Sequence, residues 1–336
     1  MNQQLAAYFS KYSIDQSGCA LQAKLNGADL HIFGASGALG TSLLLFLQLR
    51  NLKPKAITLY VRNYLGSTQL RKVCNDDSVN VIEINSDDLA FDLTKIGSSS
   101  TVIFLAGFAQ PALFLKDPRS LFHLNINLLG LIIDRRPDNI FYASTAEIYS
   151  GVDQVEAESS PFISQPQDIR GAYIEAKRAG EALLYHSANE GKRWVSFRIA
   201  LATPPWHFPD DKRVLSDLLS TAISGSNISL KGGEESIRQY QYGPLMIEKL
   251  LWAGFFGTKP VYNLAGGESL SLECIARVIA DVYGVEYCEN PERKGLKLGA
   301  PRAVNIQNEA LNLDLGFVPK TESFLDLLMA IRSMSS

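Results

Sequence analysis

Cysteine is scarce in this chain, and the cysteines do not occur in closely spaced pairs. The 336 residues contain four cysteines, Cys19, Cys74, Cys274 and Cys288, with no C-x-x-C pair and no histidine at ligand spacing beside them. This spacing argues against a disulfide framework and against a structural zinc site. We therefore expect free thiols in a reducing compartment and no bound metal.

A basic excess and a long apolar run are also missing. The formal net charge is −3 and the pI is about 5.9, so binding to nucleic acid or to an anionic membrane surface has no electrostatic basis. The apolar stretch Leu43–Leu47 is far too short to cross a bilayer. The first residues, Met-Asn-Gln-Gln, lack the basic and apolar regions of a secretory signal. A cytoplasmic globular protein is expected.

What is present is an alternation of strand-like and helical segments. Strand patterns cover 30–33, 56–61, 79–84, 101–105, 139–143 and 194–199, and helical patterns cover 41–52, 119–136 and 173–190. This alternation predicts an α/β fold of the Rossmann type, a doubly wound parallel sheet covered on both faces. We expect a helical extension at 1–28, a dinucleotide-binding domain at 29–200, and a smaller C-terminal α/β substrate-binding lobe at 201–336 whose segments interleave with that domain.

A glycine-rich loop follows the first predicted strand and precedes an apolar helix. In the series Gly34, Gly37 and Gly40, the first glycine permits a tight turn, the second lets the backbone approach a pyrophosphate, and the third allows the helix to lie against the strand. The helix N-terminus then faces the phosphates. The loop therefore predicts a dinucleotide site that includes the intervening residues, Ser36, Ala38 and Leu39.

The end of the second strand indicates which dinucleotide is bound. This position usually carries an acid that binds the adenosine ribose, but here the chain reads Leu59-Tyr-Val-Arg62-Asn63. Arg62 stands where a 2′-phosphate needs a cation, which favours NADP over NAD, although an arginine here can equally be solvated. Asp88 and Leu89, beyond the third strand, are candidates for adenine contacts; an N-cap is the other reading of Asp88.

Tyr173 and Lys177 form the candidate acid–base pair. Residues four apart share a helix face, so the hydroxyl and the ammonium can converge on one point. A nearby cation favours phenolate, so we expect Lys177 to lower the pKa of Tyr173 from its ordinary value. The spacing alone also suits an ordinary pair on a helix surface, so the prediction depends on the other motifs in the sequence.

Taken together, these motifs resemble the extended short-chain dehydrogenases/reductases, in particular the branch of nucleotide-sugar epimerases, dehydratases and decarboxylases. The resemblance covers residues 29 to 334, and the motifs most resemble UDP-glucuronate decarboxylases and dTDP-glucose dehydratases. The collinear segments are the glycine loop, 105–109, 127–130, 143–149, 173–181, 198–199, 213–216, 237–240, 262–266 and 315–319.

The resemblance implies a chemistry and a site. Thr145 would hydrogen-bond the sugar 4-hydroxyl, Tyr173 would remove its proton, and Lys177 would hold the nicotinamide ribose while hydride leaves C4 to give a 4-keto sugar. Glu147 would act as acid or base in the following step, with a solvated carboxylate as its other reading. The resemblance further implies that Leu105, Ala106 and Gly107 contact the cofactor and that Arg213, Arg238 and Arg293 bind the nucleotide sugar.

Departures from the family pattern leave the reaction open. Ala146 replaces the Asp of the dTDP-glucose dehydratases, Leu201 stands where a substrate-binding Asn is common, and Gly243 follows Tyr242 where an acidic pair is typical. An epimerase, a dehydratase or a decarboxylase acting through a 4-keto intermediate is expected. The alternatives are an NADPH-dependent reductase of 4-keto sugars and a non-enzymatic NADP-sensing protein. The resemblance and the apolar helices at 119–136 and 173–190 predict a homodimer.

Overall fold

The fold is built on one seven-stranded sheet. The computed structural model describes residues 3–15, 19–74, 79–84, 91–107, 117–152, 155, 157–290 and 305–335. All strand pairs in the large sheet are parallel, and their spatial order is β3-β2-β1-β4-β5-β6-β9. The strands are β1 (Asp29–Phe33), β2 (Ala56–Val61), β3 (Val79–Glu83), β4 (Ser100–Phe104), β5 (Asn139–Thr145), β6 (Arg193–Ile199) and β9 (Val261–Leu264).

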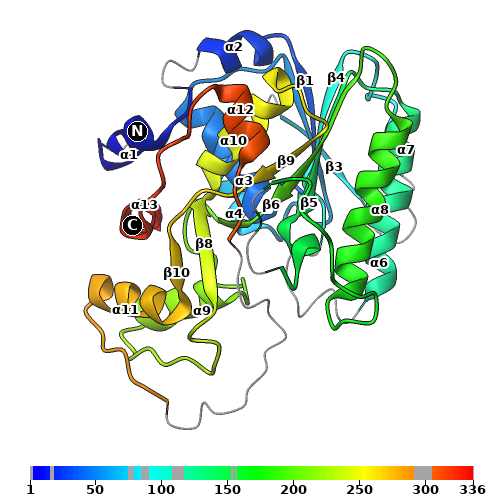
Figure 1. The fold of residues 1–336 in the computed structure, drawn as a ribbon. Helices are drawn as coiled ribbons and strands as arrows, with labels where there is room; N and C mark the ends of the chain where they lie inside the picture. Colours follow the sequence, from blue (N-terminus) through cyan, green and yellow to red (C-terminus); the bar gives the residue numbers. More distant parts are fainter. Residues whose placement is uncertain are drawn as a thin grey trace.

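Helices cover both faces of this sheet, as Figure 1 shows, with α3 and α10 on one side and α6, α7 and α8 on the other. The described helices are α1 (Gln3–Tyr12), α2 (Cys19–Leu25), α3 (Ala38–Leu49), α4 (Thr68–Val73), α6 (Pro118–Phe122), α7 (Leu129–Asp134), α8 (Gly171–Ser187), α9 (Val214–Ile223), α10 (Gly243–Phe256), α11 (Leu272–Tyr283), α12 (Glu309–Leu315) and α13 (Phe324–Ser335). A π-helical segment, η1 (His123–Leu128), and a 3-10 turn, η2 (Ala146–Tyr149), complete the set. The predicted Rossmann-type α/β fold is confirmed.

The predicted strands lie within two residues of the observed ones, and the central strands β1, β4, β5 and β6 are almost entirely buried, which explains their apolar sequences. A row of aromatic rings crosses four strands on the face covered by α8. Phe33 on β1 stacks on Tyr60 of β2 at 4.0 Å between ring centroids, and Phe104 on β4 lies 5.7 Å from both Phe33 and Tyr142 of β5.

The helix predicted over 119–136 is not one continuous α-helix. It consists of α6, the π-helical η1 and α7. Asn125 in η1 is fully buried, donates to the Leu121 carbonyl at 2.8 Å and accepts from the Tyr142 hydroxyl at 2.7 Å. A polar side chain in the core needs such partners, and the widened turn supplies them.

A second sheet of three strands lies beyond the carboxyl ends of the large sheet. Its order is β10 (Ser269–Ser271), β8 (Ile237–Tyr242) and β7 (Leu201–Thr203), and α9 and α11 lie beside it (Figure 1). The chain returns to the large sheet in β9, so residues after position 200 contribute to both sheets.

The two ends of the chain pack together. Helix α1 lies beside α13 (Figure 1). The Tyr8 hydroxyl donates to buried Glu322, and the Lys11 ammonium pairs with Asp326 at 2.5 Å. These contacts hold α1 against the end of the fold that contains α13.

Candidate active site

The strand order reverses between β1 and β4, and the glycine loop lies at that switch point. In open α/β sheets the ends of two such strands diverge and leave a crevice for a ligand. Gly34 ends β1 with φ +81°, and a Cβ there would stand 2.8 Å from the backbone of Leu105 and Ala106, which follow β4. The backbone segments that follow β1 and β4 are therefore too close together for any residue with a Cβ at position 34.

Gly40 sets the position of α3. A Cβ on Gly40 would lie 2.4 Å from the Ala35 Cα, so the first turn of the helix rests directly on the loop. Gly37 is the N-cap of α3, and a Cβ there would meet only the Gly34 carbonyl at 3.4 Å. The loop therefore has the geometry that its glycine spacing predicted, with an open face at Gly37.

The adenosine side of the crevice is formed by the exit of β2. Arg62 lines the cavity together with Gly66, Ser67, Thr68 and Gln69 at the start of α4. The two hydroxyl-bearing residues of this set were not predicted. Asp88 and Leu89, the candidates for adenine contacts, lie outside the described residues.

Thr145, Tyr173 and Lys177 meet at the carboxyl end of β5. The Thr145 side chain hydrogen-bonds Tyr173, and the Lys177 ammonium donates to the Ala143 carbonyl at 2.7 Å. A Cβ on Gly107 would lie 3.3 Å from the Lys177 Nζ, which places the ammonium against the exit of β4. Helix α8 therefore carries both groups of the predicted pair into the crevice.

The protonation of this pair differs from the prediction. Burial, and after it the negative charge of Glu147, raise the pKa of Tyr173 to about 12, although the Thr145 hydrogen bond and two arginines act in the opposite direction. The net shift of the Tyr173 pKa is therefore upward, opposite to the direction that we expected from the neighbouring Lys177. Lys177 is itself buried, and its own pKa is lowered to about 7, so burial dominates both groups.

Glu147 is held by a partner that the sequence analysis missed. Its two carboxylate oxygens accept from the Nε and Nη2 of Arg170, each at 2.5 Å, and both side chains are mostly shielded from water. Arg170 stands three residues before Tyr173, a spacing that places it near the same helix face. The candidate acid–base carboxylate is thus oriented by a bidentate ion pair.

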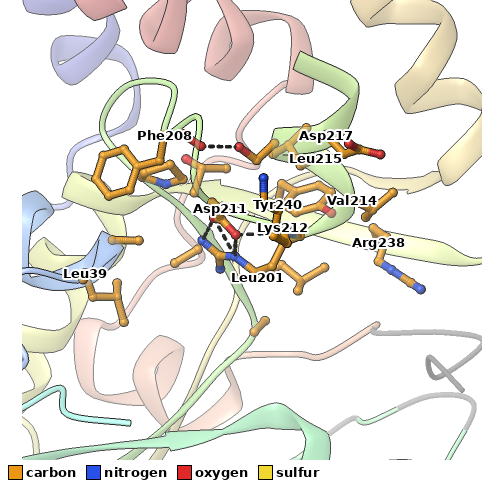
Figure 2. A pocket seen from close by; sticks show the side chains of 18 of the residues that line it. Leu39, Leu201, Phe208, Asp211, Lys212, Val214, Leu215, Asp217, Arg238 and Tyr240 are labelled. Carbon is orange, nitrogen blue, oxygen red and sulfur yellow. Dashed lines mark hydrogen bonds and ion pairs between the residues drawn. The ribbon is translucent and has the colours of Figure 1, made fainter. Parts of the chain in front are cut away.

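Two of the three predicted substrate arginines lie in the cavity wall beside this pair. Burial lowers the pKa of Arg238, and the positive charge of Arg170 lowers it further, so the two guanidinium groups share one region. The Arg213 guanidinium binds buried Asp211, with Nη2 and Oδ2 2.6 Å apart; the dashed lines at Asp211 in Figure 2 mark these bonds. Arg293 lies outside the described residues.

One large cavity joins these parts. Its volume is about 1730 Å³, and it runs from the exits of β1 and β2 to the small sheet. Ala106 is buried behind the wall and does not line it. The remaining described candidates all line the cavity: Gly34, Ser36, Gly37, Ala38, Leu39, Gly40, Arg62, Leu105, Gly107, Thr145, Glu147, Tyr173, Lys177, Arg213 and Arg238.

The family model of the NAD dependent epimerase/dehydratase family matches residues 30–264, more than half of the chain. The protein belongs to this family. The match includes the glycine loop, Thr145, Tyr173, Lys177 and Arg238, so the resemblance predicted from the sequence is confirmed.

A curated relative of this family member is UDP-glucuronic acid decarboxylase 1 of Xenopus tropicalis, 27% identical over 190 residues. The match covers 54% of this chain and 45% of that protein, so it spans less than half of the relative's length.

Solved structures show the same fold along nearly the whole epimerase/dehydratase-family chain. UDP-glucuronic acid 4-epimerase from Bacillus cereus, in complex with UDP-glucuronic acid and NAD, has a TM-score of 0.75 at 18% identity and covers 91% of this chain and 99% of its own. UDP-N-acetylglucosamine 4-epimerase from Methanobrevibacter ruminantium M1, in complex with UDP-N-acetylmuramic acid, has a TM-score of 0.74 at 17% identity, covering 92% and 99%.

The described residues of this epimerase/dehydratase-family protein contain neither a membrane-spanning helix nor a metal-binding cluster. None of their helices is long and apolar enough to cross a membrane. They also contain no group of three or more histidine, cysteine or carboxylate side chains placed to hold a metal ion.

Proposed function

We propose that this protein is an NAD(P)-dependent enzyme that modifies nucleoside-diphosphate sugars by transient oxidation at C4. The observation that carries the proposal is the meeting of Thr145, Tyr173 and Lys177 at one end of a cavity whose other end is the glycine loop. A cofactor and a sugar placed in that cavity would meet at the Tyr173 hydroxyl.

The dinucleotide fits the residues present. The turn at Gly34 and the close packing at Gly40 leave the N-terminus of α3 open toward the crevice, which suits a pyrophosphate. Arg62, Ser67 and Thr68 would surround the adenosine ribose, and a 2′-phosphate there would gain a cation and two hydroxyl donors. The bound nicotinamide supplies a hydride acceptor and donor. We favour NADP over NAD on the strength of Arg62.

Tyr173 and Thr145 have different roles in the proposed proton transfer. Tyr173 takes the proton of the sugar 4-hydroxyl. The Thr145 side chain, which hydrogen-bonds Tyr173, positions that hydroxyl beside it. Because burial raises the pKa of Tyr173 to about 12, the phenol is a poor acid until a cationic ligand or a charged Lys177 stabilises phenolate. Arg213 and Arg238, on the substrate side, would hold the diphosphate within the lobe formed mainly by residues 201–336.

Glu147 separates the candidate reactions. A carboxylate next to Tyr173 and fixed by Arg170 is placed to move a proton at a neighbouring sugar carbon after C4 is a ketone. This favours a lyase or isomerase over a simple reductase, and it agrees with the activity named for the 27% identical relative, a UDP-glucuronic acid decarboxylase. An NADPH-dependent reductase is the second candidate, and Arg62 is the observation that supports it.

We also propose that the enzyme is a homodimer of the cytoplasm. The helices expected to form the interface expose large apolar side chains: 40% of Leu131 on α7 and 58% of Tyr185 on α8 are accessible, and Phe122 on α6 is similar. A family-like interface of α7 and α8 from two copies would cover these side chains.

The proposal is tested by incubating the purified protein, with NAD or NADP, against a panel of UDP-, dTDP-, GDP- and CDP-sugars, and identifying products by mass spectrometry. Tyr173→Phe should fold and bind cofactor as before, yet lose about 10²–10⁴-fold in turnover, because a positioned acid–base group is removed. Tyr283→Phe, on α11 and outside the cavity lining, is the matched control and should keep full activity. Equal activity of both variants would contradict the mechanism.

A further inference from the structure

A buried carboxylate lies one helical turn beyond Lys177. Glu181 is 9% exposed and does not line the cavity. Its oxygens accept from the Arg198 guanidinium on β6, at 2.9 Å from Nη2 and 3.2 Å from Nε, and from the Ser144 hydroxyl on β5. A charged side chain is buried at a high cost in free energy unless it is paired, and this one is fully paired.

Lys177 and Glu181 are attached to consecutive residues of the same strand. The Lys177 ammonium donates to the carbonyl of Ala143, and Glu181 accepts from the side chain of Ser144. Because both side chains leave α8 on one face and reach β5 at adjacent positions, the carboxylate is held behind the ammonium, away from the cavity.

Arg198 fixes the carboxylate from the far side. Its Nη1 donates to the Tyr149 hydroxyl at 2.6 Å and to the Glu158 carbonyl at 2.7 Å, and the Tyr149 hydroxyl donates to Asn263 on β9 at 2.9 Å. The guanidinium is therefore held by three other segments, and Glu181 cannot be released without leaving a buried cation unpaired.

Lys177 needs a compensating charge because little else offsets its burial. Burial lowers the pKa of Lys177 to about 7, and the charge of Glu181 acts in the opposite direction. The buried or half-buried ionisable groups on the elements around Lys177 are Tyr142 on β5, Arg193 and Arg198 on β6, Glu147 and Tyr149 on η2, His123 on η1, and Tyr173, Glu175, Arg178 and Glu181 on α8 itself. Tyr185 and His186 on α8, Arg119 on α6 and Asp134 on α7 are exposed, and Arg178 and Glu175 pair with each other. Tyr142 presents its ring, 5.0 Å from the ammonium, and its hydroxyl is bonded to Asn125.

We propose that Glu181 is a positioning residue that keeps Lys177 charged and directed into the cofactor crevice, although Glu181 itself lies behind the wall. The inference rests on the proposed function, in which Lys177 holds the cofactor ribose and stabilises the Tyr173 phenolate. It adds a role for the Glu181–Arg198 pair: the pair sets the pH range in which Lys177 does so.

The test measures Lys177 itself. In the purified full-length protein, trace labelling with acetic anhydride at a series of pH values, read by mass spectrometry at Lys177, gives the midpoint at which this amine loses its proton. Glu181→Gln should lower that midpoint by about one pH unit, because an opposite charge nearby is lost and the Arg198 charge is left uncompensated. Arg198→Lys keeps the charge but loses the bidentate geometry, and should leave the midpoint in place.

A second readout connects the midpoint to function. The affinity for NADPH, followed by its fluorescence, should fall as the pH rises through the Lys177 midpoint, and Glu181→Gln should move that fall to lower pH. In Lys177→Met the dependence should vanish, and adding Glu181→Gln to Lys177→Met should change nothing further. A shifted labelling midpoint in a protein that binds no dinucleotide would sink the proposed function and leave this inference standing.

The inference is overturned if folded Glu181→Gln keeps the wild-type midpoint, or if Arg198→Lys shifts it equally, because loosened packing would then be the cause. Should Glu181→Gln fail to fold, the double substitution Glu181→Met with Arg198→Met replaces the whole buried pair, a change that proteins often tolerate. That variant should also show the lower midpoint, and an unchanged midpoint in it would equally overturn the proposal.

Discussion

At the scale of single residues, the proposed chemistry depends on Tyr173 and Lys177 of α8 and on the ion pairs that lie around them. Tyr173 and Lys177 are four apart on α8, so their spacing alone predicts that they share a face. Thr145 ends β5 and meets them because α8 packs on that strand. Arg170 could have been found from its place three residues before Tyr173. The pairing of Arg198 with Glu181, 17 residues away on the next strand, depends on how α8 packs on β5 and β6.

Arg62 decides the choice between the two dinucleotides. Arg62→Asp should weaken NADP binding and favour NAD, because a carboxylate repels the 2′-phosphate and accepts from a ribose hydroxyl. Dissociation constants for both dinucleotides, measured by calorimetry, check this. Arg71→Asp, the same change on the exposed side of α4, is the matched control and should keep the preference. A wild-type protein that strongly prefers NAD would show that the interpretation of Arg62 is wrong.

Glu147 distinguishes a lyase or isomerase from a reductase. Glu147→Gln should spare oxidation at C4, seen as reduced-nicotinamide absorbance after substrate is added, and should slow product formation by about 10²–10⁴-fold. The reason is that the second proton transfer loses its carboxylate while Thr145, Tyr173 and Lys177 remain.

The control for that change is Arg170→Lys, which keeps Glu147 and one positive charge but not the bidentate pair, and should reduce product formation less. Full product formation by Glu147→Gln would favour the reductase or a simple C4 epimerase.

At the scale of elements, the packing of α3 on the glycine loop carries the cofactor site. Gly40→Val would drive a side chain into the backbone of Ala35 and Gly34, at 2.4–2.5 Å from the first added carbon. The helix must then move away from β1, at a cost of about 1–3 kcal/mol or more. We expect a lower melting temperature and loss of dinucleotide binding.

The matched control is Gly130→Ala, also a glycine within a helix, where an added Cβ meets nothing within 4 Å. It should keep dinucleotide binding and raise stability by a few tenths of a kcal/mol to about 1 kcal/mol. Dinucleotide binding retained by Gly40→Val would show that the close contact at Gly40 is not needed to shape the crevice.

At the scale of the whole molecule, the exposed apolar side chains of α7 and α8 predict association. Light scattering at micromolar concentration should give twice the chain mass of 37.0 kDa. Leu131→Glu would place a charge in the predicted interface and should shift the protein toward monomer, because an unpaired charge is costly to bury.

Leu313→Glu is the control for association, since Leu313 is similarly exposed but lies on α12, on the other side of the sheet (Figure 1). It should leave the mass unchanged. A wild-type monomer at this concentration would contradict the homodimer.

The sequence by itself determined six strands of the large sheet and the glycine loop that follows the first of them. A strand that is buried on both faces appears in the sequence as an apolar run, and a glycine loop at the end of a strand is a local motif. Both can be predicted without knowing which segments pack against them. Only the tertiary structure decided the directions of the pKa shifts of Tyr173 and Lys177, the Arg170–Glu147 pair and the Glu181–Arg198 network. A pKa depends on burial and on charges brought from other segments, and neither is set by the residues beside it in the chain.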